Sequence, residues 1–565
     1  MPELSGSRAE AATLRGARVV DGTGSAGRAA DVVVEHGRIV DVREPGMVPY
    51  GETVELDGLV LAPGFIDCHT HYDAQVLWDP ALTPSSWHGI TTAVLGNCGF
   101  GVAPTRPEHR EWIVRTLENV EAMSADALNA GMQWSFESFP EYLDALERLP
   151  LGLNVAAMIG HTPLRLFVLG EDAVRRRSTD AEIATMKALV GEALDAGAVG
   201  FATSKNPGHF GAWGNPVPSR LADPAEIFEI AQALTERQRG VIAINEGSDF
   251  GWREVGALAR QTRRNVTWTA ITTDQDVDAI LSEAELLGEL QWPQLPCRAI
   301  VMQIVLSDPA PLARAAAFGE VLAVPQRERA RIYADPAWRE RARRDTAPPG
   351  SDNWRPTTPG AEARRPFFPW SKISVAETSV HHALVNGPSM AELAARGGVD
   401  PLDVFCDLAL AEDLGTRFRV VLANDDEDEL AVLLKDDRLL LGLSDAGAHA
   451  SQLVDAVFST YLLEHWVRET GVLSLEKAVW PSGLRVRSSW RGRIAAGAHA
   501  DLVAFDPAAV GVEEVHRVWD QPGGADRLIA RSRGYEGVWI NGGRVAAGGV
   551  ATGSAAGVVI RDGGL

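Results

Sequence analysis

The sequence predicts an α/β fold, a (β/α)₈ TIM barrel that carries a small β-sandwich formed from both chain ends. Three observations predict it. The middle of the chain alternates apolar, strand-like runs with helical periodicity. Both ends are rich in short strands and tight turns. The length of 565 residues also exceeds that of one compact domain of about 150 residues.

Both ends of the chain show the same pattern of short strands and tight turns, and neither end alone can bury both faces of a sheet. We therefore expect residues 1–60 and 486–565 to pair into one composite β-sandwich. Residues 61–485 form the barrel in this interpretation. Its eight strands are expected at 61–71, 90–98, 153–161, 198–205, 240–246, 266–273, 298–305 and 439–445.

Helical periodicity lies between these runs, for example at 180–196, 223–239 and 389–396. Nearly continuous apolar strands that alternate with helices are typical of a parallel sheet covered on both faces. Eight such units favour a closed barrel over an open sheet, which would need fewer strands and usually a glycine-rich phosphate turn.

The gap between the seventh and eighth expected strands is unusually long. Residues 306–438 are predicted to form an insertion or lid, because a loop of that length inside a compact domain is uncommon. Within it, residues 341–370 combine charge with many prolines. We expect partial disorder there.

Composition excludes several classes of function. Lys and Arg number 53 and Asp and Glu number 76, so the net charge is −23. A negative field of this size repels phosphate backbones and anionic lipid, so we expect no nucleic-acid or membrane partner. Four scattered cysteines cannot form a disulfide framework, and no uninterrupted apolar stretch approaches 18 residues. The sequence predicts a cytoplasmic protein.

The first chemical motif ends the first expected strand. His69 and His71 are two residues apart in Asp-Cys-His-Thr-His, so both rings point to the same side of a strand. At the carboxyl end of a barrel strand that side faces the mouth, where barrel active sites lie. Two converging imidazoles suit a metal ion such as zinc. The alternative is a pair of histidines that make surface hydrogen bonds.

The second motif closes the eighth expected strand. Asp445 follows a wholly apolar run, where a carboxylate is costly unless a cation or hydrogen bonds compensate it. A metal ion with a water molecule would do so. The structural alternative is an aspartate that caps the following helix.

Together these segments resemble the amidohydrolase superfamily. The resemblance rests on His69-Thr-His71, on SDAGAH at 444–449, on GAHADLVAFDP at 497–507 and on the split β-rich ends. Within the superfamily the chain is similar to the N-acyl-D-amino-acid deacylase (D-aminoacylase) branch. That similarity rests on WHGITT at 87–92, GNCGFG at 96–101, GHTPLR at 160–165, GAVGFATS at 197–204 and NGPSMAELA at 386–394.

The resemblance implies a metal-dependent hydrolase of amide bonds other than peptide bonds, with one or two Zn²⁺ ions. By position, His69, His71, Cys98 and Asp445 match metal ligands of the branch, and Asp445 also matches its proton shuttle. A metal ion lowers the pKa of bound water from 15.7 toward about 7, which supplies hydroxide at neutral pH. For Cys98 the alternative is a small buried apolar residue.

The chain departs from the branch at strands five and six, which end in metal-binding histidines there. Neither 240–246 nor 266–273 contains a histidine. Glu246 is a candidate replacement ligand. Lys205, at the end of the fourth strand, is a candidate carboxylated bridging lysine, or a cation that holds a substrate carboxylate.

Four further residues are candidate substrate contacts. His161 could stabilise an oxyanion, and His209 lies in a loop above the fourth strand. Arg165 and Arg220 could bind a substrate carboxylate through the planar guanidinium group. For the two arginines an internal salt bridge is the competing interpretation.

The leading functional hypothesis is a zinc-dependent N-acyl-(D-)amino-acid deacylase whose only partner is a small amide substrate. A second hypothesis keeps barrel and metal but changes the substrate to a cyclic amide, a carbamate or an ester. A third is a degenerate barrel that binds a ligand without hydrolysing it. Assembly into a homo-oligomer is left open.

Overall fold

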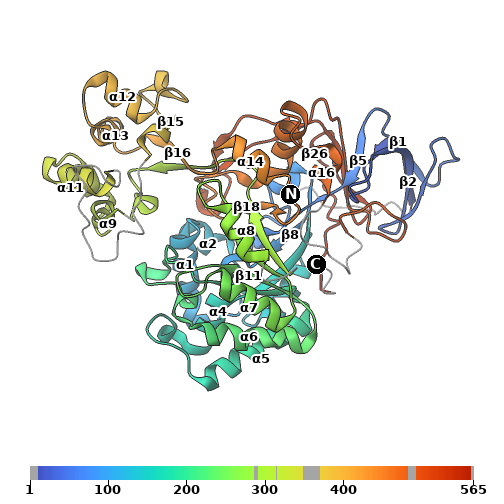
Figure 1. Ribbon diagram of the computed structural model, residues 1–565, viewed down its shortest axis with the longest axis horizontal. Coiled ribbons are helices and arrows are strands. Elements are labelled where there is room, and N and C mark those ends of the chain that lie inside the picture. The colour runs from blue at the N-terminus through green and yellow to red at the C-terminus, as the bar shows by residue number, and fades with distance from the viewer. Residues whose placement is uncertain (1–10, 286–289, 314, 348–368, 481–490, 562–565) are drawn as a thin grey trace. The chain divides into compact units, whose positions relative to one another are not determined.

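The computed structural model describes residues 11–285, 290–313, 315–347, 369–480 and 491–561. The chain divides into two compact units (Figure 1). The first unit comprises Met1–Arg298 and Asp426–Leu565, and the second comprises Ala299–Asp425.

The first unit is built around a parallel sheet that curls into a barrel. Its strands follow one another in chain order and pair in parallel: β6 (Phe65–Asp67), β8 (Ile90–Leu95), β9 (Asn154–Gly160), β10 (Gly200–Ser204), β11 (Val241–Asn245), β12 (Val266–Thr269), β13 (Gln291–Leu295) and β17 (Leu440–Leu441). The sheet closes where the extensions of its first and last strands meet. There β7 (His69–Thr70) pairs in parallel with β18 (Leu443–Ala446). The predicted TIM barrel is confirmed.

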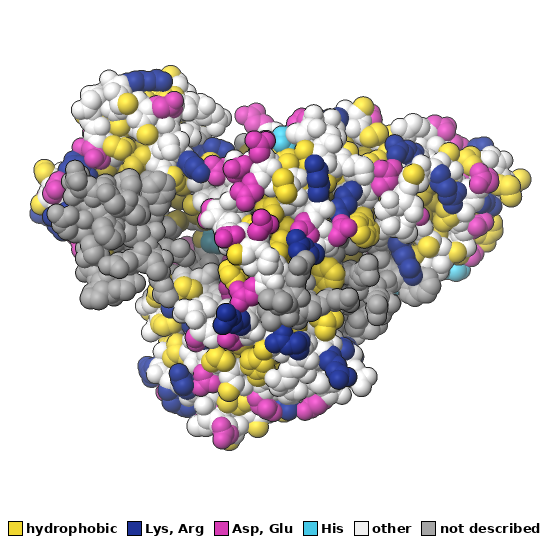
Figure 2. All heavy atoms as spheres, viewed as in Figure 1, with side chains coloured by type: hydrophobic (Ala, Val, Ile, Leu, Met, Phe, Trp, Pro, Cys, Tyr) yellow, Lys and Arg dark blue, Asp and Glu magenta, His cyan; other side chains and the backbone are white. Residues whose placement is uncertain are grey.

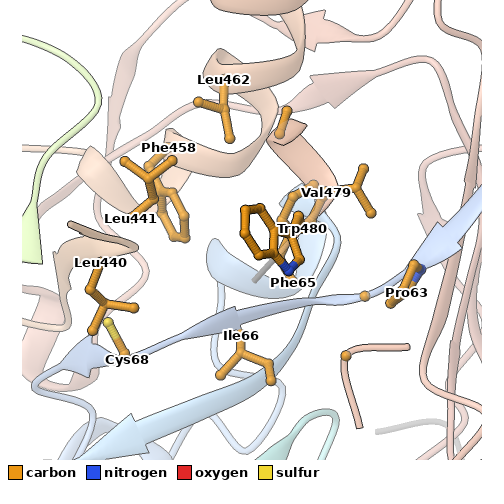
Figure 3. Close-up of a pocket in the computed structure, with 13 residues that line it drawn as sticks. Pro63, Phe65, Ile66, Cys68, Leu440, Leu441, Phe458, Leu462, Val479 and Trp480 are labelled. Carbon is orange, nitrogen blue, oxygen red and sulfur yellow. The ribbon is translucent and has the colours of Figure 1, made fainter. Parts of the chain in front are cut away.

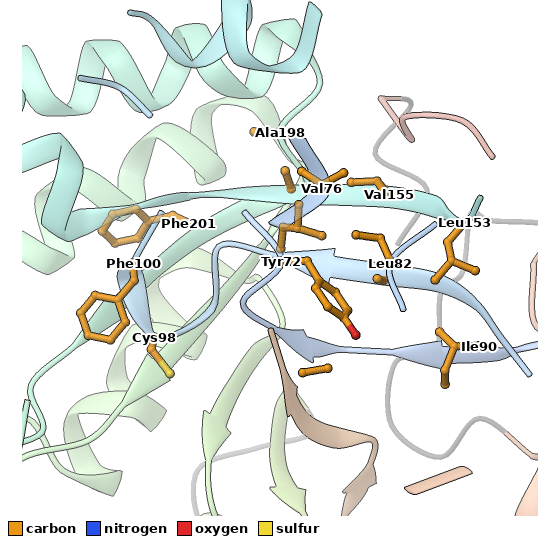
Figure 4. Packing of buried hydrophobic residues seen from close by; sticks show 14 of the residues in the cluster. Tyr72, Val76, Leu82, Ile90, Cys98, Phe100, Leu153, Val155, Ala198 and Phe201 are labelled. Carbon is orange, nitrogen blue, oxygen red and sulfur yellow. The ribbon is translucent and has the colours of Figure 1, made fainter. Parts of the chain in front are cut away.

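Apolar runs form these strands because both of their faces are covered. Every residue of β8, β9, β10 and β11 is buried. Figure 4 shows this core around Val155 and Phe201. The helices that follow the strands include α1 (Arg110–Val120), α2 (Ala125–Gly131), α3 (Phe139–Glu147), α4 (His161–Leu169), α5 (Asp180–Ala196), α6 (Pro224–Arg237), α7 (Trp252–Thr262), α8 (Val277–Glu285), α14 (Glu427–Leu433), α15 (Phe458–Tyr461) and α16 (Leu475–Val479).

Helix α5 shows how local sequence sets these boundaries. Thr179 and Glu182 form a capping box at its start, and Gly197 ends it in the left-handed conformation with φ +117°. Both signals are visible in the sequence, and the predicted range 180–196 matches the helix.

Strands from both ends of the chain share one nine-stranded sheet. Its order is β26 (Val550–Ala551), β25 (Gly543–Ala547), β24 (Tyr535–Ile540), β19 (Leu502–Phe505), β5 (Val60–Pro63), β1 (Ala11–Val19), β2 (Arg28–Glu35) and β3 (Arg38–Arg43), with β4 (Glu52–Glu55) beside β1. The two ends meet where β5 pairs antiparallel with β19. Side chains of this sheet, among them Leu14, Val32 and Leu502, form a separate apolar cluster.

The second unit has a core of its own. A three-stranded antiparallel sheet, in the order β14 (Ile300–Val305), β16 (Arg417–Ala423) and β15 (Ile373–Glu377), packs with α9 (Ala316–Leu322), α10 (Gln326–Tyr333), α11 (Pro336–Thr346), α12 (Met390–Gly397) and α13 (Pro401–Leu410). This unit, 299–425, overlaps the insertion predicted at 306–438. Of the segment 341–370, for which we expected partial disorder, residues up to Thr346 are helical and 348–368 lie outside the described residues.

The prediction for the seventh barrel strand was wrong. The segment 298–305 was expected there, but Ile300–Val305 belongs to the antiparallel sheet of the second unit. The seventh strand is instead β13, Gln291–Leu295, which pairs with β12 and β17. The apolar pattern did not predict this strand, because two glutamines and a proline interrupt its sequence, QWPQL. The strand is nevertheless largely buried. The helix expected at 389–396 is α12, which also belongs to the second unit.

On the face shown in Figure 2, acidic side chains are interspersed with basic ones. No helix among the described residues is long and apolar enough to span a bilayer.

Candidate metal centre

His69 and His71 come from the extension of the first barrel strand. Strand alternation turns Asp67, His69 and His71 toward one side and Ile66 and Cys68 toward the other. Both imidazoles are only 2% exposed. Burial of two rings at the carboxyl end of a barrel strand agrees with the position predicted for metal ligands.

Cys98 lies in a tight turn (η3, Asn97–Gly99) that follows β8 rather than in the strand itself. Two glycines permit this turn. Gly96 has φ +85°, and a Cβ there would stand 2.2 Å from the carbonyl oxygen of Met158. A Cβ at Gly99 would stand 2.7 Å from the Cα of Thr203. The turn therefore packs flat against β9 and β10 and directs Cys98 toward the histidines.

Asp445 lies in β18, where the pairing with β7 is irregular between Leu443 and Ala446. Its backbone is left-handed, with φ +55°, which aspartate tolerates better than most residues. The side chain is 30% exposed, so it faces the mouth as well as the histidines.

The four predicted ligands converge. The His69 Nε2 atom lies 3.3 Å from the Cys98 Sγ and 3.4 Å from the Asp445 Oδ1. The His71 Nε2 atom lies 3.1 Å from the same carboxylate oxygen. The donor atoms of His69, His71 and Cys98 all lie within 4.8 Å of one another. Side chains from the first, second and eighth strands thus surround one point.

The chemistry of these donors fits a cation. The His71 Nε2 atom is buried and has no hydrogen-bond partner among the described residues, although Asp445 is adjacent. Burial raises the pKa of the Cys98 thiol well above its usual value, so a thiolate there needs a positive charge. Burial also opposes ionisation of Asp445, but His69 and His71 hold the pKa of its carboxyl well below the usual range. A metal ion would satisfy all three groups.

Two outer partners of the histidines were missed by the sequence analysis. Gln294 in β13 is fully buried, and its Oε1 lies 2.6 Å from the His69 Nδ1. Glu121, at the end of α1, is 3% exposed, and its Oε1 lies 3.5 Å from the His71 Nδ1. Nothing in the local sequence marks Glu121, and Gln294 lies in a strand that the apolar pattern did not predict.

Neither proposed replacement ligand belongs to the converging group. Glu246 directly follows β11, and its Oε2 is buried without a hydrogen-bond partner among the described residues. Burial raises the pKa of this carboxyl to about 7. Its role as a ligand stays a prediction.

Lys205 is enclosed by acceptors. Its Nζ donates to the carbonyl oxygens of Arg220, at 2.9 Å, and Ala222, and it lies 3.0 Å from the carboxylate of Asp249. This is the environment of an ammonium group. It does not favour a carboxylated lysine, and only 4% exposure leaves little access for a substrate carboxylate.

His161 and Arg165, which were predicted to contact the substrate, belong to a buried hydrogen-bond network inside the protein. The His161 Nε2 donates to the Glu226 Oε1 at 3.0 Å, and the Arg165 guanidinium pairs with the same carboxylate. His161 and Arg165 are fully buried. For Arg165 the structure contains the internal salt bridge that was the competing interpretation.

His209 and Arg220 lie in the loops after β10. The His209 Nδ1 is 2.7 Å from the Ser204 Oγ, and its ring centroid is 5.3 Å from that of Phe100. Phe100 in turn lies 6.4 Å from the His71 ring. Arg220 donates to the His209 carbonyl oxygen and covers the Phe210 ring at 4.8 Å. Of the predicted substrate contacts, His209 thus has the most direct connection to the metal ligands.

The reverse side of the first strand faces an apolar cavity of about 60 Å³ (Figure 3). Ile66, Cys68, Leu441, Phe458 and Trp480 are among its lining residues. None of the described residues that line the cavity is charged or strongly polar. The metal ligands therefore lie on the polar side of the strand and this cavity on the other.

Comparison with known proteins agrees with this geometry. A family model described as "Amidohydrolase family" matches residues 52–340. The N-acyl-D-aspartate deacylase of Alcaligenes xylosoxydans xylosoxydans is 30% identical over 542 residues, 94% of this chain and 91% of that protein. The D-aminoacylase of the same organism is 29% identical over 503 residues, 88% of each chain.

Solved structures show the same fold. A crystal structure of D-aminoacylase has a TM-score of 0.65 at 24% identity and covers 97% of this chain and 99% of that one. The N-acyl-D-glutamate deacylase from Bordetella bronchiseptica, complexed with zinc and a phosphonate inhibitor, has a TM-score of 0.65 at 25% identity and covers 98% and 100%. The chain belongs to the amidohydrolase family, and it is a hydrolase of carbon–nitrogen bonds other than peptide bonds.

Proposed function

We propose that this protein is a zinc-dependent deacylase of N-acyl-D-amino acids. The observation that carries the proposal is the convergence of His69, His71, Cys98 and Asp445 at the barrel mouth. Two curated relatives that align along most of the chain are a D-aminoacylase and an N-acyl-D-aspartate deacylase. A third, 28% identical, is an N-acyl-D-glutamate deacylase. All three names specify an acylated amino acid of the D series.

Zinc is the ion that suits these donors, since it accepts nitrogen, sulfur and oxygen ligands in a tetrahedral arrangement. We propose that the centre holds one ion. The described donors surround a single point, and the strands opposite end in Asn245 and Thr269, which are neutral. The nearest carboxyl on that side, Glu246, is not among the converging donors. A structurally similar D-aminoacylase, by contrast, has a binuclear metal centre.

When bound, the ion would polarise the scissile carbonyl and lower the pKa of the attacking water. Asp445 would take a proton from that water and transfer it to the leaving nitrogen, which its partly exposed position at the mouth permits. Asp445 lies beside the His69 and His71 nitrogens that would hold the ion, so the bound cation would keep its carboxyl ionised and able to accept the proton. His209 is the best-placed residue to contact the substrate from the side of β10.

A cyclic amide, carbamate or ester substrate is the second candidate. It is favoured by one feature, the absence of histidine at the ends of β11 and β12, which changes the part of the mouth opposite the proposed ion.

The test is a matched substrate panel on metal-loaded protein of measured zinc content. N-acetyl and longer N-acyl derivatives of D-amino acids are compared with their L enantiomers, and with lactams, hydantoins and aryl esters. We expect turnover of the D derivatives well above that of the L enantiomers. Turnover of only cyclic amides or esters would support the second candidate, and absence of bound metal would overturn both.

We further propose a cytoplasmic location, which four buried free cysteines support because disulfides are rare there. The partner proposed is a small amide, with no nucleic acid or membrane. Light scattering of purified protein would decide between a monomer and a homo-oligomer.

A further inference from the structure

Glu121 is a buried carboxylate beside the candidate metal centre that the proposed reaction does not use. It follows directly after α1, and its backbone N–H donates to the Leu117 carbonyl oxygen at 3.0 Å. The side chain is almost fully enclosed, and burial, together with the charges of Asp445 and Asp73, raises the pKa of its carboxyl well above the usual value when no cation is bound nearby. A carboxylate in such a place is costly unless it has a partner of opposite charge or a hydrogen-bond donor.

The two carboxylate oxygens of Glu121 face two different histidines. Oε1 lies 3.5 Å from the His71 Nδ1, and Oε2 lies 4.0 Å from the His449 Nε2. The backbone carbonyl oxygen of Glu121 also accepts a hydrogen bond from the His449 N–H at 2.6 Å. Glu121 therefore connects a predicted metal ligand in the first strand to the loop that follows the eighth strand.

The orientation of His71 makes this contact informative. Its Nε2 faces Asp445, so its Nδ1 is the atom left to meet Glu121. A histidine that binds a metal through one ring nitrogen commonly donates its other N–H to a carboxylate, which fixes the tautomer and strengthens the ligand. His69 has the same arrangement with a neutral partner, because its Nδ1 meets the Gln294 Oε1.

We propose that Glu121 is a positioning residue of the metal centre: its carboxyl group faces the His71 Nδ1 and keeps the Nε2 turned toward the ion, and the carboxylate form that a bound cation favours raises the affinity of the site for that cation. This inference rests on the proposed metal-dependent function. It differs from that function because it concerns a residue that touches neither the ion nor the substrate.

The experiment measures zinc affinity of the full-length protein by competition with a chromophoric chelator. Glu121→Gln removes the charge and keeps the shape. We expect its zinc affinity to fall about 10- to 100-fold, the usual effect of changing an outer partner of a ligand. With cobalt substituted for zinc, we expect the visible absorption of the ion to shift, because the ligand field of His71 changes.

Glu226→Gln is the matched control. Glu226 is as buried as Glu121 and also contacts a histidine, but that histidine, His161, lies outside the converging donors. We expect its zinc affinity and cobalt spectrum to match those of the wild type, even if the free energy of unfolding falls. Glu121→Asp, which keeps the charge on a shorter side chain, is expected to lie between Glu121→Gln and the wild type, and it replaces Glu121→Gln if that variant does not fold.

The outcomes separate this inference from the proposed function. A wild type that binds no zinc would overturn the proposed function. A wild type that binds zinc, with a folded Glu121 variant within twofold of its affinity and an unchanged cobalt spectrum, would overturn the role of Glu121 alone.

Discussion

The two sides of the barrel mouth carry different chemistry. The side formed by the first and eighth strands and the turn after the second supplies His69, His71, Cys98 and Asp445. The opposite side, formed by the fifth to seventh strands, ends in the neutral Asn245, Thr269 and Gln294. Glu246, which follows β11, is the one candidate ligand on this side, and Thr269 and Gln294 contact the candidate ligand His69.

The contacts made by the neutral side show what it does. Gln294 accepts from the His69 Nδ1, and Thr269 Oγ1 lies 3.3 Å from the same nitrogen. The Gln294 Nε2 donates to the Thr267 Oγ1 at 2.9 Å. One side of the mouth thus carries the candidate ligands of an ion. Residues on the other side contact the candidate ligand His69 and would fix the orientation of its ring.

The largest expected difference is between two substitutions, one on each side of the barrel mouth. His69→Ala removes a donor, and we expect bound zinc and hydrolysis to fall to background, a loss of at least about 10³-fold in activity. Asn245→Ala, on the neutral side, is expected to retain zinc near the wild-type content. Elemental analysis and initial rates measure both. Loss of zinc from Asn245→Ala, or its retention in His69→Ala, would break the comparison.

Within the charged side, Asp445 is expected to affect chemistry more than metal binding. Asp445→Asn removes the proton acceptor and should lower kcat by about 10²- to 10⁴-fold, the usual range for general acid–base catalysis. Zinc content should stay above about half that of the wild type, because three donors remain. Steady-state kinetics on metal-loaded protein give the result. A variant with wild-type kcat would exclude Asp445 as the proton shuttle.

The buried network of His161, Arg165 and Glu226 is expected to affect stability rather than metal binding. Burial disfavours the charge of Glu226, but the His161 hydrogen bond and Arg165 lower the pKa of its carboxyl from 4.5 to about 2. Ionised Glu226 then stabilises the fold by about 3 kcal/mol above pH 4.5, and this contribution is lost as the pH falls toward 2.

Glu226→Gln should therefore lower the free energy of unfolding at pH 7 and flatten its decline between pH 5 and 2. Denaturant titrations at several pH values, on wild type and variant, measure this. Parallel pH profiles for the two proteins would contradict the assignment.

The smallest effect is expected on the neutral side. Gln294→Leu leaves the His69 Nδ1 without its amide acceptor, and zinc affinity should fall about 10-fold, the lower end of the range for such partners. Thr269→Val, which removes only the longer contact, is the control and should change affinity less. Equal affinities for wild type and Gln294→Leu would show that the neutral side does not orient the ligands.

Much of the barrel could be predicted because its strands are apolar along their whole length. The ranges expected for the second to sixth strands overlap β8 to β12, and α5 matches its predicted bounds. The seventh strand could not be found this way, since Gln291 and Gln294 are buried polar residues that break the apolar pattern. The more apolar run at 300–305 belongs to another sheet, which local composition does not reveal.

Residue spacing pointed to candidate donors, because His69 and His71 have strand spacing and Asp445 ends an apolar run, while Cys98 became a candidate only through the family resemblance. Only the tertiary structure decided which groups stand behind them. Glu121 and Gln294 are 50 or more residues from the histidine that each contacts. Closure of the barrel between β7 and β18 brings the two ends of the strand order together. The residue after α1 then places a carboxyl group beside the His71 imidazole, and β13 places an amide beside that of His69. Spacing along a chain sets the direction of neighbouring side chains, but contacts across a closed sheet depend on how the whole sheet curls.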